Sequence, residues 1–132
     1  MQFFYEHPSL PSIARRTHSL DFPTHLHQQP ELYHLLEGTA IVTVDRETYR
    51  LEAGDLAVIL PHRLHSYARV GETLAQLCIA ELSLLGEYAP VLMRHACADP
   101  VVRAPDVHPD IPHSLEALSG PLPEPLAKAY LA

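Results

Sequence analysis

Three histidines and one glutamate of this sequence are spaced so that they could bind a single metal ion. The chain contains 10 His among 132 residues. His25 and His27 are two residues apart, and on an extended strand such side chains point to the same face. Glu31 follows a bend at Pro30, from which its carboxylate can return to the same point. These residue types are common ligands of transition metals.

A third imidazole, that of His65, completes the candidate ligand set. His65 lies eleven residues after Gly54, with Pro61 between them. We expect this segment and the His25 segment to occupy neighbouring strands of a closed sheet, which brings the imidazoles together. Three nitrogens and one oxygen suit Fe, Mn, Ni, Zn or Cu and leave positions open for a ligand or water. The alternative is that the same residues only pack and form hydrogen bonds.

The segments that must position these residues have the pattern of short strands separated by turn signals, which is typical of a β-sandwich or barrel. The expected strands are 13–20, 31–36, 39–44, 48–51, 56–60, 64–70 and 74–82. We predict that 31–36, 39–44 and 48–51 are consecutive antiparallel strands. Residues 45–47 are the predicted hairpin turn, although Arg46 stands where a tight loop prefers glycine. Gly71-Glu72 is the predicted turn between the last two strands.

The pattern changes to a helical period after the barrel. Residues 83–96 are predicted to form an amphipathic helix, 99–112 a proline-rich connection and 113–118 a short helix. An apolar helical stripe from 122 runs to the end of the sequence, so we expect the chain to be part of a longer protein. The predicted organisation is an arm (1–12), a barrel core (13–82) and C-terminal helices with their connection (83–132), which pack on the barrel or form a dimer contact.

Composition excludes several classes of function. The net charge is −7 and the 9 basic residues form no cluster, which argues against nucleic-acid binding by this chain itself. No apolar stretch approaches the length of a membrane span, and no signal peptide is visible, so a cytoplasmic location is expected. The nucleophile elbow, the P-loop and the dinucleotide-binding fingerprint are missing. Cys78 is expected to be a small buried apolar residue.

Residues 25–38 and 54–65 resemble the two signatures of the cupin superfamily, G-x5-H-x-H-x3,4-E-x6-G and G-x5-P-x-G-x2-H-x3-N. The departures are Ser19 in place of the first Gly, Pro61 one place late, Arg63 near the expected Gly and Arg69 in place of the final Asn. All four ligand positions of the family are nevertheless filled, by His25, His27, Glu31 and His65.

A narrower resemblance covers residues 22–67, FPTHLHQQPELYHLLEGTAIVTVDRETYRLEAGDLAVILPHRLHSY, which is similar to the N-terminal sensing domain of AraC-type transcription regulators. This resemblance implies an all-β fold, a double-stranded β-helix (cupin or jelly-roll barrel), followed by C-terminal α-helices. It implies a small-molecule effector such as a sugar or another metabolite, a homodimer, and DNA binding only through a domain that this chain does not contain. Regulators of this type often keep some of these positions without a metal, but the complete set of His25, His27, Glu31 and His65 makes a divalent transition metal (Zn, Ni, Mn or Fe) the candidate cofactor. No catalysis is expected.

The candidate effector site contains the four ligand residues and Tyr67. Tyr67 follows His65 by two residues, so it either lines the pocket or packs in the core, whereas Tyr33 and Tyr49 are expected to pack. His34 and His62 are expected at the surface or just behind the ligands. The aromatic arm residues 3–5 are either a disordered terminus or a cover over the barrel mouth.

Two other functions stay open. A stand-alone metal-dependent cupin enzyme, a dioxygenase or isomerase, would use the same four ligands to activate substrate or O2. Metal content and turnover would identify such an enzyme, whereas a regulator would show stabilisation by its effector. A carbohydrate-binding module is the weakest alternative, because the chain has no Trp to stack on a sugar.

Overall fold

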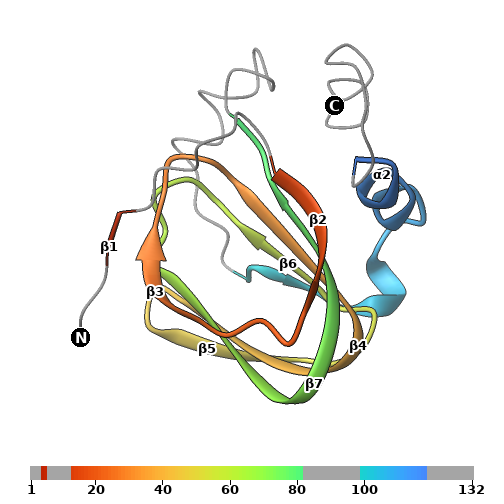
Figure 1. Cartoon of the computed structure of the whole chain (residues 1–132), viewed down its shortest axis with the longest axis horizontal. Helices are drawn as coiled ribbons and strands as arrows, with labels where there is room; N and C mark the ends of the chain where they lie inside the picture. The colour runs from red at the N-terminus through yellow and green to blue at the C-terminus, as the bar shows by residue number, and fades with distance from the viewer. Residues whose placement is uncertain (1–3, 6–12, 82–98, 119–132) are drawn as a thin grey trace.

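The computed structural model describes residues 4–5, 13–81 and 99–118, which form a β-barrel with one helix on its outside (Figure 1). The elements are β1 (Phe4–Tyr5), β2 (Ile13–His18), β3 (Phe22–Leu26), β4 (Glu31–Val44), β5 (Glu47–Leu51), β6 (Leu56–Ile59), β7 (His65–Ile79), β8 (Val101–Val102), the 3-10 turn η2 (Ala104–Asp106) and α2 (Asp110–Leu118). No helix in these ranges is long and apolar enough to cross a membrane.

Two long bent strands, β4 and β7, run antiparallel along each other and belong to both halves of the barrel. The second half of β7 pairs with β2 and the first half with β3. Likewise, the first half of β4 pairs with β6 and the second half with β5. The two halves therefore enclose one interior, which Figure 1 shows between β2 and β6 above and β5 below.

The prediction that 31–36 and 39–44 are separate strands is wrong, because the chain bends at Gly38 without turning back. The pairing register with β7 shifts on both sides of Glu37, and Gly38 has a φ of 92°. A Cβ at this glycine would lie 2.4 Å from the carbonyl oxygen of Glu72. The predicted turn at Gly71 is likewise a bend inside β7. Bulges of this kind bend a strand and let a sheet curl into a barrel.

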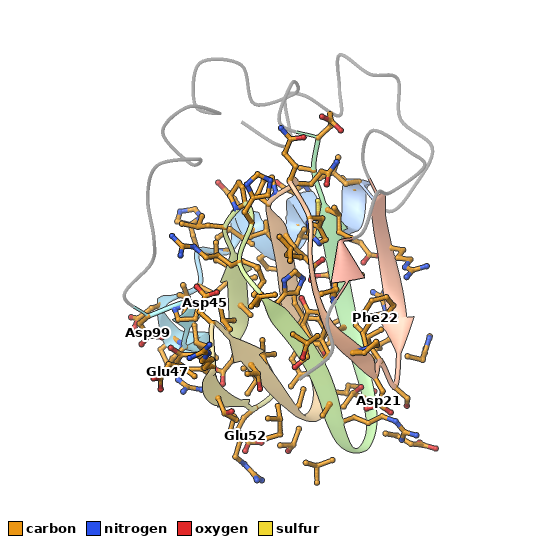
Figure 2. All side chains as sticks on the ribbon, turned by 90° about the vertical axis from the view of Figure 1, so that its left-hand side faces the viewer. Asp21, Phe22, Asp45, Glu47, Glu52 and Asp99 are labelled. Atoms are coloured by element: carbon orange, nitrogen blue, oxygen red, sulfur yellow. The ribbon has the colours of Figure 1, made fainter. Side chains whose placement is uncertain are left out.

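The interior is filled by alternate side chains of the long strands, as the two-residue period of a strand requires. Tyr33, Leu35 and Val42 of β4 are fully buried. The buried cluster comprises Tyr33, Leu35, Ala40, Val42, Val44, Leu51, Ala57, Ile59, Tyr67, Ala75, Leu77 and Val101. The acidic side chains labelled in Figure 2 (Asp21, Asp45, Glu47, Glu52 and Asp99) are exposed, whereas Glu31 and Asp55 are buried.

The β4–β5 hairpin turns through Asp45 and Arg46, with φ values of 47° and 77°. Positive φ at both positions is the signature of a type I′ turn, in which glycine is preferred and a side chain costs free energy. We expect Arg46→Gly to raise the free energy of unfolding by about 0.5–1 kcal/mol, part of the gain being offset by the entropy of the unfolded chain. Urea denaturation measures the change. The control variant Glu47→Gly, one residue farther along in β5, should lower the free energy of unfolding. A lower free energy of unfolding in Arg46→Gly would contradict the assignment of a type I′ turn.

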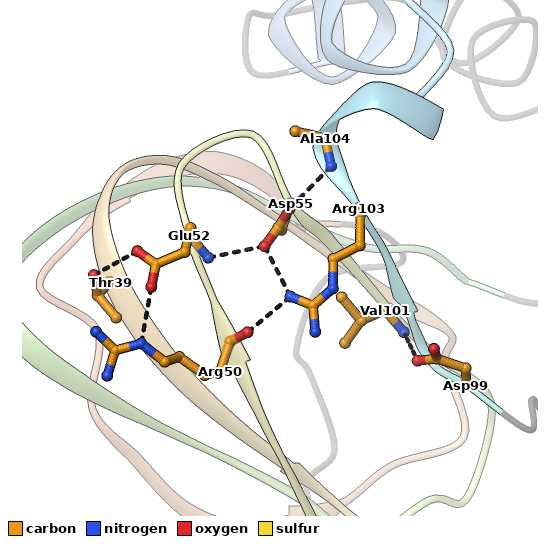
Figure 3. A network of polar contacts seen from close by, with 8 residues as sticks. All are labelled: Thr39, Arg50, Glu52, Asp55, Asp99, Val101, Arg103 and Ala104. Atoms are coloured by element: carbon orange, nitrogen blue, oxygen red, sulfur yellow. Dashed lines mark hydrogen bonds and ion pairs between the residues drawn. The ribbon is translucent and has the colours of Figure 1, made fainter.

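The segment after residue 98 is more ordered than the irregular connection predicted for 99–112. It contains β8, which pairs with β6, and then η2. The buried carboxylate of Asp55 binds this segment to the barrel through Arg103 and the backbone of Ala104 (Figure 3). The helix predicted at 113–118 begins earlier, at Asp110, with Pro112 in its first turn, where proline is tolerated.

The other expected helices, 83–96 and 122–132, lie outside the described residues. Of the arm, only Phe4–Tyr5 is described, and its backbone pairs in parallel with His25–Leu26. The arm therefore meets the barrel beside the first of the candidate ligands, and for these two residues the expectation of a disordered terminus is wrong.

Candidate metal centre

The backbone register of two neighbouring strands positions the first pair of imidazoles. His25 of β3 is directly opposite His65 of β7, so both side chains project from the same face of the sheet. Their ring centroids are 4.1 Å apart. His27 follows β3 by one residue and retains the orientation expected two residues after His25, its ring centroid lying 5.5 Å from that of His25.

The four predicted ligands meet at one point inside the barrel. One side-chain ligand atom from each of His25, His27, Glu31 and His65 lies within 4.8 Å of every other, and we refer to these four residues as the His/Glu cluster. All four are buried, with exposed fractions of 1–3%. Glu31 begins β4, directly after Pro30, so the bend predicted at this proline brings its carboxylate to the imidazoles.

Hydrogen bonds to backbone carbonyls orient each imidazole. The Nδ1 atoms of the three histidines lie 2.7–2.8 Å from the carbonyl oxygens of Pro23 (bonded to His25), Gln29 (bonded to His27) and Arg63 (bonded to His65). A carbonyl oxygen only accepts, so each Nδ1 carries the proton and donates it. In the neutral imidazole the lone pair then resides on Nε2, which is how histidine ligands of metals are held in proteins.

Glu31 is the negative centre of the cluster. Its Oε1 lies 3.1 Å from Nε2 of His27 and its Oε2 lies 3.4 Å from Nε2 of His65. The hydroxyl of Tyr67 donates a hydrogen bond to Oε2. Burial alone would raise the pKa of Glu31, but the contacts with His27, His65 and Tyr67 lower it to about 2. The carboxylate is therefore charged at neutral pH.

His25 is neutral at the same pH. Burial, and secondarily the proximity of His65, lower the pKa of its imidazole to about 4. The imidazole therefore offers a lone pair and no charge, which is the form that binds a metal ion. Phe22 packs edge-on against this ring, with centroids 4.5 Å apart, and fixes its orientation from the apolar side.

The donor set fits a divalent transition metal. With Nδ1 of His27 donating to a carbonyl, the approach of its Nε2 to a carboxylate oxygen at 3.1 Å requires either a proton on Nε2 or a cation that both atoms bind. His25, His27, Glu31 and His65 would hold the ion. When bound, it would supply a Lewis-acidic positive charge and open coordination positions.

A cavity of about 50 Å³ adjoins the His/Glu cluster. Its lining residues are Arg15, Leu20, Phe22, His25, Glu31, Tyr67, Leu77 and Ile79. Half of these residues are apolar (Leu20, Phe22, Leu77 and Ile79), and Arg15 and Glu31 are charged. Ligand pockets for drug-sized molecules occupy roughly 300–1,000 Å³, so this cavity suits a molecule of a few non-hydrogen atoms.

Tyr67 takes the position expected for a pocket residue. It lines the cavity and bonds Glu31, and its ring also stacks against that of Tyr33 in the core at a centroid distance of 4.7 Å. Both alternatives considered for Tyr67 thus describe part of its role. Tyr33 is buried and Tyr49 packs half-buried against the core, as expected.

His34, His62 and Cys78 lie outside the His/Glu cluster. The imidazole of His34 is buried, not at the surface, and its Nδ1 donates to Gln76, which in turn bonds Glu116 of α2. His62 is exposed, and its backbone N–H donates to the carbonyl of His27. Cys78 is buried as expected; burial, together with the charge of Glu31, raises the pKa of its thiol to about 11.

Sequence reasoning missed Arg15, Leu20, Phe22, Leu77 and Ile79 as cavity residues. The two-residue alternation around His25 and His65 could have found part of this set. It could not find Arg15, because the pairing register of β2 with β7 is not visible in the sequence.

Comparison with known proteins agrees with this architecture. Residues 17–80 match a protein-family model described as "Cupin domain". No curated protein matches the sequence.

Among solved structures, the cupin domain of Cnp3 from Schizosaccharomyces pombe has a TM-score of 0.52 at 14% identity, over 64% of this chain and 66% of that one. A cupin protein from Bacteroides fragilis has 29% identity and a TM-score of 0.44, over 53% and 64% of the two chains. An RmlC-like cupin from Shewanella frigidimarina has 21% identity and a TM-score of 0.48, over 52% and 65%. The barrel of this chain is thus a cupin-fold domain: residues 17–80 match the "Cupin domain" model, and the barrel shares its fold with the Cnp3 domain.

Proposed function

We propose that this chain is the effector-sensing domain of an AraC-type transcription regulator, in which a divalent transition metal held by the His/Glu cluster forms part of the effector site. The observation that carries the metal-dependent part is the convergence of three oriented imidazoles and a charged carboxylate beside a cavity. The regulatory part is supported by the resemblance of residues 22–67 to that family. These residues make up β3 to the start of β7, which contain all four cluster residues.

The residues of the chain have separate tasks in such a site. Tyr67 holds the Glu31 carboxylate in place, and the carbonyls of Pro23, Gln29 and Arg63 hold the imidazoles. The apolar walls formed by Leu20, Phe22, Leu77 and Ile79 displace water from the ligand. An effector regulates only if it binds one arrangement of the domain more tightly than another. The backbone of β1 at His25 and the strands around the cavity are the elements that ligand binding would bias.

The size of the cavity favours an effector smaller than a sugar. About 50 Å³ accommodates a few water molecules or a molecule with two or three carbon atoms. The site therefore takes a small metabolite unless the walls move apart.

Metal titration of the purified chain tests the proposal. Protein prepared without a chelating column and stripped of metal should bind about one Zn, Mn, Ni or Fe ion per chain in calorimetry. Its melting temperature should rise with metal concentration, because only the folded chain assembles the site. The regulatory part is tested by sequencing the gene beyond the codon for Ala132, where two helix-turn-helix units are expected. A chain that takes up none of these metals, or a gene that stops at this codon, would contradict the corresponding part.

A metal-dependent enzyme is the second candidate, favoured by the completeness of the ligand set and by its direct access to a cavity. The two functions differ in what happens to a bound small molecule. A sensing domain returns its ligand unchanged, whereas an enzyme converts it or consumes O2. Incubation of the metal-loaded protein with candidate ligands, followed by mass spectrometry and oxygen-electrode measurements, separates the two.

A further inference from the structure

We infer that Arg15 makes the cavity a site for a small carboxylate anion. In this arrangement the guanidinium binds the carboxylate of a ligand whose other end faces the His/Glu cluster. This inference rests on the proposed function and names the chemical class of its ligand.

The register of β2 against β7 directs Arg15 toward the cavity. Arg15 is directly opposite Leu77, and residues opposite each other in an antiparallel pair share one face of the sheet. Leu77 is buried in the core and lines the cavity, as does Arg15. The side chain of Arg15 is also exposed to solvent, so it lies at the open side of the cavity, where it can meet an entering ligand.

The next residue shows the contrast. Arg16 is opposite Gln76 on the outer face, and its guanidinium lies 3.1 Å from the carboxylate of Glu116 in α2. Arg15 has no acidic partner within residues 4–5, 13–81 and 99–118. One arginine of the pair therefore serves the fold, and the other presents its charge at the cavity.

The charges around the cavity require an anion. A divalent ion in the cluster would carry more charge than the single carboxylate of Glu31 neutralises, because the cluster contains no other acid. Arg15 adds a second positive charge to the lining of the cavity, beside the apolar Leu20, Phe22 and Ile79. A negatively charged ligand is attracted both by Arg15 and by a cation in the cluster, whereas a neutral ligand gains neither attraction in full.

A carboxylate suits this cavity better than a phosphate. The planar guanidinium matches the two oxygens of a carboxylate with two parallel hydrogen bonds. A short carbon chain matches the apolar walls and the volume of about 50 Å³. A phosphate dianion carries a second negative charge, and the buried carboxylate of Glu31, which belongs to the cluster, would repel it.

Binding of small acids and their amides by three forms of the metal-loaded protein tests the inference. The forms are the wild type, Arg15→Gln and Arg16→Gln, and the probes are glycolate and pyruvate with glycolamide and pyruvamide as neutral counterparts. We expect the wild type to bind at least one of the acids in calorimetry and to bind its amide more weakly. Arg15→Gln should weaken binding of the acid about 10- to 100-fold and leave that of the amide unchanged. Arg16→Gln, which removes the same charge from the outer face, should change the affinity less than 2-fold.

Metal content, measured on the same samples, separates this inference from the proposed function. If all three forms bind metal but Arg15→Gln binds the acids as tightly as the wild type, only the role of Arg15 is overturned. The same holds if neither acid binds the metal-loaded wild type, or if inorganic phosphate binds more tightly than both acids. If the wild type binds no metal, the proposed function fails, while acid binding that still depends on Arg15 would support the anion site itself.

Discussion

Replacement of His27 by alanine is expected to weaken metal binding by more than about 100-fold. Loss of a group that merely supports a ligand costs 10- to 100-fold, and His27 is itself placed as a ligand, so its removal should cost more. Its Nε2 lies 3.1 Å from Glu31, and its ring is 5.0 Å from that of His65, so the remaining ligands have no substitute for it. Elemental analysis and competition with a fluorescent chelator measure the loss.

The matched control is His62→Asn. His62 is an exposed histidine whose backbone N–H donates to the carbonyl of His27, a bond that asparagine retains. Its φ of 60° is one that asparagine adopts readily. The control should therefore keep full metal content and normal stability. Equal metal binding by His27→Ala and the wild type would mean that the His/Glu cluster is a packing and hydrogen-bonding arrangement without a metal.

A second readout separates loss of a ligand from loss of the fold. His27 is buried, so its truncation leaves a small cavity and removes a hydrogen bond to the carbonyl of Gln29. We expect the metal-free variant to lose about 1–3 kcal/mol of unfolding free energy while keeping its far-UV circular dichroism. The variant should also lose the metal-dependent rise in melting temperature. Retention of that rise would contradict the assignment of His27 as a ligand.

The candidate ligands could be predicted from the sequence because their geometry is local. The spacing of His25 and His27 fixes a shared face on a strand, and the bend at Pro30 returns Glu31 to them. His65 is forty residues away from His25 along the chain, and its place opposite His25 followed only from the expectation of a closed sheet. The structure brings the four together, and the cupin family match explains why the spacing was informative.

The strand connections were predicted less well, because Gly38 and Gly71 have two structural interpretations. Glycine marks tight turns, and it also marks bulges where another backbone approaches. The sequence predicted turns, and the structure has bends within the continuous strands β4 and β7. What decides between them is the contact of Gly38 with the backbone of Glu72, which is 34 residues away in the sequence.

Arg15 illustrates a different limit. An arginine on a predicted strand is expected to be exposed, and both Arg15 and Arg16 are, but only Arg15 also lines the cavity. Which of the two lies beside the cavity depends on the register of β2, and a shift of one residue would exchange them. The register is set by pairing with β7, whose own extent the sequence did not show.

Replacement of Asp55 by alanine is expected to lower the free energy of unfolding by about 2–4 kcal/mol. The carboxylate of Asp55 is buried and accepts hydrogen bonds from the backbone N–H groups of Glu52 and Ala104, at 2.9 Å each. It also accepts a bond from Arg103 at 3.0 Å (Figure 3). Removal of the acceptor leaves two backbone donors without a partner, and each costs about 1–3 kcal/mol where water does not replace it. Chemical denaturation measures the loss.

An acidic residue of the same network provides the control. Glu52 bonds Arg50 and Thr39 through a side chain that is 57% exposed, and exposed ion pairs contribute 0–1 kcal/mol. Glu52→Ala leaves the backbone N–H that bonds Asp55, so it should cost less than about 1 kcal/mol. Similar losses in the two variants would show that Asp55 contributes no more than a surface charge.

The effect of Asp55 should depend on pH in a defined direction. Burial alone would raise the pKa of its carboxyl, but the N–H donors of Glu52 and Ala104 and the charge of Arg103 outweigh burial and lower it. A carboxyl whose pKa is lower in the folded than in the unfolded chain stabilises the folded state. This contribution is complete at pH values above the pKa of the unfolded chain, about 3.9, and is lost as the pH falls through the pKa of the folded chain. The stability difference between the wild type and Asp55→Asn should therefore be constant near pH 7 and shrink below about pH 4.

The segment that Asp55 holds, 99–118, includes α2, so limited proteolysis after residue 98 should accelerate in Asp55→Ala at neutral pH and in the wild type only in acid.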